Sequence, residues 1–470
     1  MSHPAESIRT SADFKGPRSA DPASADGARI VADAVCTACG CLCDDIDLTT
    51  SADSNFGRTT IVAAARACTL GKRWFFETAT RDDGPVCTID GRPATLAEGI
   101  DRAARLLLAA GYPLIYGLSQ TTCEAQRIAV GMGDRLGAVV DVAGASRRTL
   151  LGATFHGVGE ATCTLGEVRN RGDLLVYWGA DPAEDQPRHF TKHALTPVGR
   201  FLPGGRRDRY VVLVDTRRTR TADVCDEFIR IRDDAHFEAL WTLRALAAGV
   251  DLDAAAVERD VGVPLPVWQA LVERMKRAVY GALLYDDRLS AADGGPLAVE
   301  GLSALTRDLN AYARFVSVGL GSAGNGAGAS NVLTWQTGFA YGVNFARGYP
   351  RSNASEFTAE RVLARREADV VLAVGAGNVG ELGDAARRHW NTITKIVVGA
   401  DPADASSATV RFRTAPYGLA APGTVHRADG VALALRPARA ATRPDDLEVL
   451  SRLERRIAEL QVAYGNRRSS

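Results

Sequence analysis

The feature that most constrains this chain is a cluster of cysteines in residues 35–45, which read Val-Cys-Thr-Ala-Cys-Gly-Cys-Leu-Cys-Asp-Asp. Cys36, Cys39 and Cys43 are separated by two and three residues, and Cys68 follows after 24 intervening residues. Short loops of this kind let thiolates converge on one small metal unit, which a distant fourth ligand completes. The three-residue gap favours an iron–sulfur cluster over a zinc knuckle, which usually repeats a two-residue gap.

The alternative is a set of structural cysteines, because a free cysteine behaves as a small buried hydrophobe. Four cysteines within eight positions, followed by two aspartates, are unusual in an ordinary core, so the pattern favours a metal site or a former one. Cys41 lies inside the loop and can compete as a ligand. The total of nine cysteines is odd, which favours reduced thiols or metal ligands in the cytoplasm over a disulfide framework.

The composition is that of a globular protein with two or three domains, since 46% of the 470 residues are hydrophobic and 24% are charged. Basic and acidic residues balance at 56 each, so bulk charge indicates neither a nucleic acid nor a membrane surface as a partner. No apolar run approaches the roughly 18 residues of a membrane-spanning helix. Residues 1–30 are polar and carry acids, which predicts a disordered tail and argues against a transit peptide.

From about residue 95 the sequence alternates short apolar strands with helices, and the strands end in Gly or Asp turns. This alternation predicts parallel α/β sheets, which bind ligands at the carboxyl ends of their strands. The expected strands are Pro113–Tyr116, Gly137–Val142, Leu174–Trp178, Tyr210–Asp215, Val279–Tyr285, Phe315–Val318, Val370–Val374 and Thr394–Val398.

Helices are expected at Ile61–Lys72, which carries Cys68, at Cys123–Leu136, at Asp234–Ala248 and at Asp446–Tyr464, where leucines form one apolar face. The expected organisation is a tail (1–30), a cysteine-cluster lobe (31–110), a first α/β domain (111–265), a second α/β domain (266–415) and a C-terminal segment with a long helix (416–470).

Residues 375–380 match G-x-G-x-x-G between an expected strand and an expected helix, and Asp401 lies 21 residues further on. That context is typical of dinucleotide binding, and the alternative is a tight turn built from small residues. Arg147 and Arg148 also follow a strand, where they can meet an anion or form a solvated surface pair. No zinc-protease motif or serine triad is present in the sequence.

These residues together resemble the B subunit of formylmethanofuran dehydrogenase, a molybdopterin-oxidoreductase-type protein, from about Val35 to the C-terminus. The strings that carry the resemblance are Cys36–Cys43 with Asp44-Asp45, Ala67-Cys68, Pro113–Gly117, Cys163–Asn170, Trp178-Gly179, Pro187–His189, Val214-Asp215, Arg218-Thr219, Phe345–Arg351, Glu356–Thr358 and His426–Gly430.

The resemblance implies a multidomain α/β fold with parallel sheets and a small cysteine-cluster lobe. It also implies that Cys36, Cys39, Cys43 and Cys68 hold a 4Fe–4S cluster. In the family, the α/β domains hold a bis-molybdopterin guanine dinucleotide that carries tungsten or molybdenum, and a cysteine binds that metal.

This chain departs from the family at the pterin site. The position of the metal-binding cysteine is occupied by Arg147, and Cys123 on the preceding helix is not equivalent to it. Further departures from the family's pterin-contacting residues fall at Asp181, Gln186, His236 and Asn378. The resemblance therefore implies that tungsto- or molybdopterin is absent, and it leaves open whether the cluster site is occupied or vestigial.

A bacterial branch of the family fits these departures. In methylotrophs, a formyltransferase/hydrolase complex passes a formyl group from tetrahydromethanopterin through a furan-type carrier to formate, without electron transfer. The expected function is the redox-silent, cavity-forming B subunit of such a complex, with its other subunits and a furan-type carrier as partners. Arg147 and Arg148 would then fill the emptied metal site or steer an acidic carrier.

Two alternatives remain. The first is a working B subunit of formylmethanofuran dehydrogenase, with a tungsten- or molybdenum-pterin and a 4Fe–4S cluster. The second is a nicotinamide enzyme that uses the glycines at 375–380.

Overall fold

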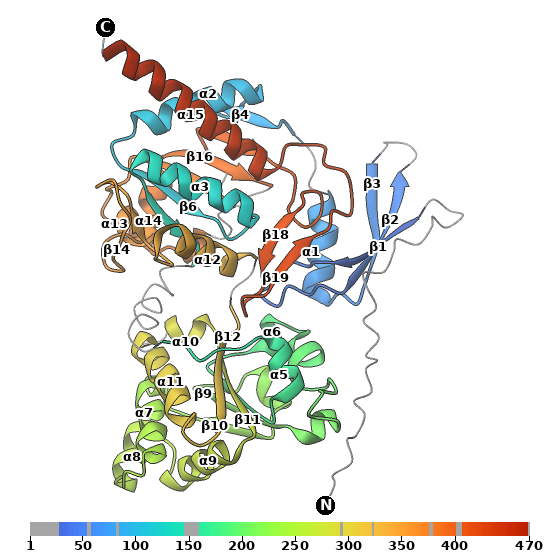
Figure 1. Cartoon of the computed structure of the whole chain (residues 1–470), viewed down its shortest axis with the longest axis vertical. Helices are drawn as coiled ribbons and strands as arrows, with labels where there is room; N and C mark the ends of the chain where they lie inside the picture. The colour runs from blue at the N-terminus through green and yellow to red at the C-terminus, as the bar shows by residue number, and fades with distance from the viewer. Residues whose placement is uncertain are drawn as a thin grey trace, which may run out of the picture.

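The computed structural model of the chain describes residues 28–53, 58–80, 84–144, 159–291, 295–321, 324–375, 379–400 and 407–468. These residues form two α/β lobes, one above the other in Figure 1, and a small N-terminal lobe beside them. Most of the expected tail lies outside the described residues. The last two residues assigned to it, Arg29 and Ile30, belong to strand β1.

The five-stranded lobe (described residues within 159–321) contains a fully parallel sheet in the order β10-β9-β8-β11-β12. The strand order reverses between β8 and β11, which are neighbours. Helices cover both faces, so β8 and β11 are buried at every residue. The strands are β8 (Leu174–Trp178), β9 (Tyr210–Asp215), β10 (Glu227–Arg230), β11 (Tyr280–Tyr285) and β12 (Arg314–Gly319). The helices are α5 (Leu165–Arg171), α6 (Pro182–Asp185), η1 (Phe190–Ala194), η2 (Gly205–Asp208), η3 (Arg220–Asp223), α7 (His236–Ala247), α8 (Ala254–Val261), α9 (Leu265–Arg277), α10 (Asp287–Ala291) and α11 (Gly295–Leu309).

The nine-stranded lobe is built around the order β14-β13-β7-β6-β15-β16-β17-β4-β5, in which the run from β7 to β17 is parallel. Here the order reverses between β6 and β15. The strands are β4 (Cys87–Ile89), β5 (Arg92–Ala94), β6 (Pro113–Gly117), β7 (Val139–Val142), β13 (Val343–Asn344), β14 (Arg351–Ser352), β15 (Val370–Val374), β16 (Thr394–Gly399) and β17 (Val410–Arg413). The helices are α2 (Leu96–Ala109), α3 (Cys123–Leu136), α12 (Gly326–Thr337), α13 (Ala359–Ala364), η4 (Val379–Glu381), α14 (Asp384–Trp390) and α15 (Asp446–Arg468).

The C-terminal helix α15 confirms the expected long helix. It lies across α2 and α3 at the top of Figure 1. Its apolar stripe, which includes Leu450, Leu453 and Ile457, is fully buried in the core of the nine-stranded lobe. The periodicity of the sequence therefore predicted the buried face of this helix correctly.

The cysteine lobe (described residues within 28–80) consists of an antiparallel sheet and one helix. A hairpin from the C-terminal part packs beside it, and residues of this hairpin region share a small core with Val35 and Leu42 of the cysteine loop, residues 35–45 (Figure 1). The elements are β1 (Arg29–Ala34), β2 (Ile46–Asp53), β3 (Arg58–Ala65), α1 (Thr69–Thr80), β18 (Gly423–His426) and β19 (Ala432–Leu435).

The helix expected at Ile61–Lys72 is wrong. The first part of this segment belongs to strand β3, which pairs with β2, and the helix begins only at Thr69. Four consecutive β-branched residues, Thr59–Val62, favour an extended backbone over the helix that the following alanines suggested. Cys68 consequently lies in the turn before α1 and not on the helix.

The sheets divide the chain differently from the expected domain boundaries. β6 and β7, expected in the first α/β domain, pair in the sheet of β15 and β16, while β11 and β12 join β8 and β9. β4, expected in the cysteine lobe, pairs with β17. The five-stranded lobe is thus inserted between two halves of the nine-stranded lobe, which a linear division of the chain misses.

Two helical glycines provide a matched test of packing. A Cβ at Gly99, in α2, would overlap Cys87 Sγ and stand 2.8 Å from the Phe412 ring, whereas a Cβ at Gly131, in α3, meets nothing closer than 3.8 Å. We expect Gly99→Ala to lower the free energy of unfolding by about 1–3 kcal/mol through overpacking. Gly131→Ala should raise it by about 0.5–1 kcal/mol through helix propensity. Thermal unfolding of both variants checks this, and equal shifts of the same sign would contradict it.

Candidate functional site

The four expected ligands come together around one small enclosed space. Cys36, Cys39, Cys43 and Cys68 line it, with Ala38, Cys41, Ile46, Ala67 and Arg188. The loop folds back on itself, since the Cys36 N–H donates to the Cys43 carbonyl at 2.9 Å. Gly71 in α1 leaves room for Cys36, because a Cβ there would stand 3.1 Å from Cys36 Sγ, whereas its 3.9 Å to Cys68 Sγ would be an ordinary contact.

The thiols of this site differ in the direction in which their pKa values are shifted. Burial raises the pKa of Cys39 to about 12 and that of Cys36 well above its usual range, and neighbouring thiols add to both shifts. A hydrogen bond from the Cys41 thiol lowers the pKa of Cys43 to about 7, and the charges of Lys192 and Arg188 act in the same direction. Cys41 is therefore a neutral donor to Cys43 in this arrangement, and its pKa is raised.

The donor set is one that an iron–sulfur cluster accepts, because four thiols line one space. Within the described residues, no group of three or more His, Cys, Asp or Glu side chains is arranged to hold one metal ion. A four-iron cluster binds each thiolate through a different iron atom. Four thiols around one apolar space, with cations beside them, match that chemistry.

Two cavities open where the carboxyl ends of both sheets meet the cysteine loop. The first has a volume of about 450 Å³ and is lined by the loops after β8 and β11, by Glu381 after β15, and by Cys39 and Gly40. The second, of about 310 Å³, extends toward α12 and shares Gly40, Asp286, Asp287 and Gly321 with the first. Because strand order reverses between β8 and β11, this is the position at which doubly wound sheets bind ligands.

Carboxylates dominate the described lining of both cavities. The first contains one basic side chain, Arg288, which is paired with Asp185 and lies 3.8 Å from an Asp286 oxygen. The described lining of the second contains no lysine or arginine. The lining carboxylates are Glu160, Glu184, Asp185, Asp286, Asp287, Glu381 and Asp429.

Two of these carboxyl groups lose their protons at a higher pH than usual. Burial raises the pKa of Asp286 to about 7, and the charge of Asp287 adds to this, while the Arg288 N–H that donates to Asp286 at 2.8 Å opposes it. Burial also raises the pKa of Glu160 to about 7, against a hydrogen bond from Tyr285. Sequence analysis missed both residues; the only signal for Asp286 was its place directly after a strand.

The pKa of Asp286 predicts a pH-dependent effect on stability. Its folded-state pKa lies above its unfolded-state value, so the penalty for ionising it is absent below about pH 4, grows as the pH rises, and is complete above about pH 7. Asp286→Asn, which keeps the acceptor for Arg288, should therefore raise the melting temperature more at pH 8 than at pH 5. Thermal scans at both pH values check this, with Asp234→Asn at an exposed position as the control. A larger gain at pH 5 would contradict the assignment.

The positions at which the sequence departs from the family pattern are only partly brought together. Gln186 lines the first cavity and donates to the Leu320 carbonyl at 2.6 Å. Asp181 is buried and accepts from both the N–H and the hydroxyl of Thr221, at 3.0 and 2.6 Å. His236 accepts from the Trp178 indole at 3.2 Å, and burial lowers its pKa to about 4. Arg147, Arg148 and Asn378 lie outside the described residues.

The described part of the glycine segment, Gly375 and 379–380, does not open an α-helix; residues 376–378 lie outside the described residues. Gly375 has a φ of +46°, and a Cβ there would stand 2.6 Å from the Gln120 carbonyl oxygen. This glycine is therefore needed for the close approach of two chain segments. The next α-helix, α14, begins at Asp384, beyond the third glycine, whereas the fingerprint places its glycines at the helix start. The tight-turn interpretation fits better than nicotinamide binding.

None of the described helices is both long and apolar enough to cross a membrane.

Solved structures identify the class of fold. Acetylene hydratase from Pelobacter acetylenicus superposes with a TM-score of 0.63 over 90% of this chain and 69% of its own, at 10% identity, which shows the fold alone. The formyltransferase/hydrolase complex FhcABCD from Methylorubrum extorquens, solved with methylofuran, contains a chain that matches with a TM-score of 0.64 at 25% identity. That match covers 80% of this chain and 99% of the other. The molybdopterin-oxidoreductase-type fold expected from the sequence is confirmed.

Sequence comparison identifies the family. The chain is 33% identical to the B subunit of the tungsten-containing formylmethanofuran dehydrogenase 2 of Methanocaldococcus jannaschii, over 87% of this chain and 93% of the relative. It is 29% identical to the B subunit of the formyltransferase/hydrolase complex Fhc of Methylorubrum extorquens, over 60% of this chain and 73% of the relative. A comparison with protein-family models finds no match. The chain belongs to the family of formylmethanofuran dehydrogenase B subunits.

Proposed function

We propose that this chain is the non-redox B subunit of a formyltransferase/hydrolase complex in tetrahydromethanopterin-linked one-carbon metabolism, where the formyl group leaves as formate. Its own role is structural: it joins the other subunits and lines an internal cavity that a furan-type formyl carrier can reach. The Fhc complex of Methylorubrum extorquens supports the proposal, because its B subunit matches in sequence and a chain of its solved structure matches in fold.

The observation that carries the proposal is the charge of the cavity at the two strand-order reversals. A bis-molybdopterin guanine dinucleotide brings a pyrophosphate in each half, and anions at such sites are normally met by N–H donors and cations. The described lining instead presents Glu184, Asp185, Asp286, Asp287 and Glu381 with Arg288 as its basic side chain. Arg220 and Arg288 pair with Glu184 and Asp185, and the pKa of Asp286 is raised, so the repulsion of a pyrophosphate comes from the carboxylates that stay ionised. These residues do not fit the pterin cofactor, in agreement with Arg147 at the position of the metal-binding cysteine.

The four cysteines support a separate part of the proposal. They surround one enclosed space, and we propose that they hold a 4Fe–4S cluster that stabilises the fold of the cysteine lobe. A cluster can persist without redox function because binding of the metal is coupled to folding of its ligand loop.

The second candidate is a working dehydrogenase subunit with a tungstopterin. The 33% identity to a tungsten-containing enzyme over 87% of the chain favours it. In that case the acidic lining and Arg147 would have to be reconciled with a dianionic pyrophosphate and a metal that lacks its cysteine ligand.

Metal analysis of the native complex, purified without oxygen, separates the two candidates. We expect no tungsten or molybdenum, and about four iron atoms and about four sulfide ions per chain. A tungsten-containing relative purified in parallel shows that the procedure retains the metal. Stoichiometric tungsten or molybdenum in this complex would overturn the non-redox proposal.

A further inference from the structure

A double ionic clamp joins the cysteine loop to the five-stranded lobe. The Arg188 guanidinium forks onto both carboxylate oxygens of Asp45, at 2.7 Å each. The Lys192 ammonium contacts Asp44 and also lies 2.9 Å from Asp45. Asp44 and Asp45 directly follow the ligand Cys43, so the clamp acts on the end of the loop that carries a ligand.

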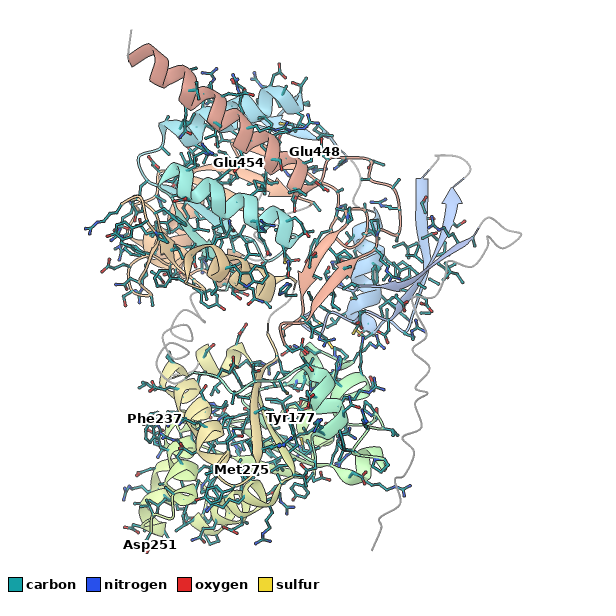
Figure 2. All side chains as sticks on the ribbon, in the orientation of Figure 1. Tyr177, Phe237, Asp251, Met275, Glu448 and Glu454 are labelled. Atoms are coloured by element: carbon teal, nitrogen blue, oxygen red, sulfur yellow. The ribbon has the colours of Figure 1, made fainter. Side chains whose placement is uncertain are left out.

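The cations of this clamp are rigidly anchored. Arg188 lies just before η1 and Lys192 lies within it. η1 is a π-helical turn, a kind of turn often found at functional sites. The intervening His189 is fully buried in the lobe and lies 2.8 Å from the hydroxyl of Tyr177, which Figure 2 labels within the five-stranded lobe. The Arg188 and Lys192 side chains are only 17% and 13% exposed. Asp44 and Asp45 are 39% and 36% exposed, so solvent screens the carboxylate side of the clamp.

Arg188 also faces the thiolates themselves. It lines the space that the four ligands enclose, and its charge acts on Cys43. Four thiolates around a cluster carry net negative charge, and the charge and hydrogen bonds around the sulfurs set the cluster's stability and potential. The bidentate contact with Asp45 fixes the direction of the guanidinium, which a lysine at this position could not reproduce.

We infer that Arg188 is a positioning residue of the metal centre: through Asp45 it holds the Cys43 end of the loop on the five-stranded lobe, and it supplies positive charge to the cluster thiolates. This inference rests on the cluster proposed for the four cysteines, and it is independent of whether a tungstopterin is present.

The test compares Arg188→Gln, Arg188→Lys and Asp45→Asn in the purified complex after anaerobic reconstitution with ferrous iron and sulfide. Arg206→Gln is the matched control, because Arg206 makes a 2.7 Å ion pair with Asp226 in the same lobe and does not line the space of the four cysteines. Iron and sulfide per chain, the rate of iron loss to a chelator and the reduction potential of the cluster are measured.

We expect Arg188→Gln to lose iron to the chelator about tenfold faster or more, in line with other residues that support metal ligands. Its cluster should have a lower reduction potential, because the reduced cluster carries more negative charge. Arg188→Lys should keep most of the wild-type reduction potential, because the positive charge remains. It should retain less iron than the wild type, because lysine cannot make the bidentate contact with Asp45. Asp45→Asn should impair retention, and Arg206→Gln should match the wild type.

Wild-type iron retention and potential in Arg188→Gln would overturn the inference. A wild-type complex that takes up no iron would overturn the metal centre and this role with it. Tungsten in the same samples would overturn the non-redox function and leave the role of Arg188 standing.

Discussion

Replacement of Cys68 with serine is expected to remove most of the iron that the reconstituted complex retains. Cys68 is the one expected ligand outside the cysteine loop, and it closes the space that the other three line. Without its thiolate, one iron atom lacks a protein ligand and the loop loses its link to α1. Iron and sulfide analysis and the visible absorption of the cluster measure the effect.

The control is Cys225→Ser in the five-stranded lobe. The Cys225 thiol donates to the Thr221 carbonyl at 3.1 Å, and a serine hydroxyl can replace that bond, so iron content should not change. Cys41→Ser tests the ligand assignment within the loop. Retention of iron in this variant, with loss in Cys43→Ser, agrees with Cys43 as ligand; the reverse pattern would transfer that role to Cys41.

Replacement of Asp141 with alanine is expected to lower the free energy of unfolding by about 3 kcal/mol. Asp141 is 1% exposed at the end of β7. Its two carboxylate oxygens accept the N–H of Gly342 at 2.9 Å and that of Ala359, at the start of α13, at 2.7 Å. Removing the carboxylate leaves two buried donors without an acceptor, and each such donor costs roughly 1–3 kcal/mol.

Asp369→Ala provides the matched control for this prediction. Asp369 also accepts two backbone N–H groups, from Gly111 at 2.6 Å and Tyr112 at 3.1 Å, but it is exposed. Water can satisfy these donors once the carboxylate is removed, so the cost should stay below about 1 kcal/mol. Denaturant unfolding of both variants measures the difference. Equal losses would show that burial does not decide the energy of these contacts.

Local patterns predicted the elements well. The expected helix Cys123–Leu136 coincides with α3, and the apolar run Leu174–Trp178 coincides with β8, because such segments are buried whichever strands they pair with. The segment Ile61–Lys72 failed because its alanines suit a helix while its β-branched start suits a strand, and pairing with β2 decided between them. Domain boundaries failed because sheet pairing is not encoded in any local stretch.

The sequence by itself determined the four-thiol motif and the family, since each is a matter of residue type and spacing. Only the tertiary structure decided which side chains meet. It placed Arg188 against Asp45, 143 positions apart in the chain, and it collected Asp286, Glu160 and Glu381 around two neighbouring cavities. Long-range neighbours depend on the order of strands in two sheets, and the carboxyl ends of those strands define the site.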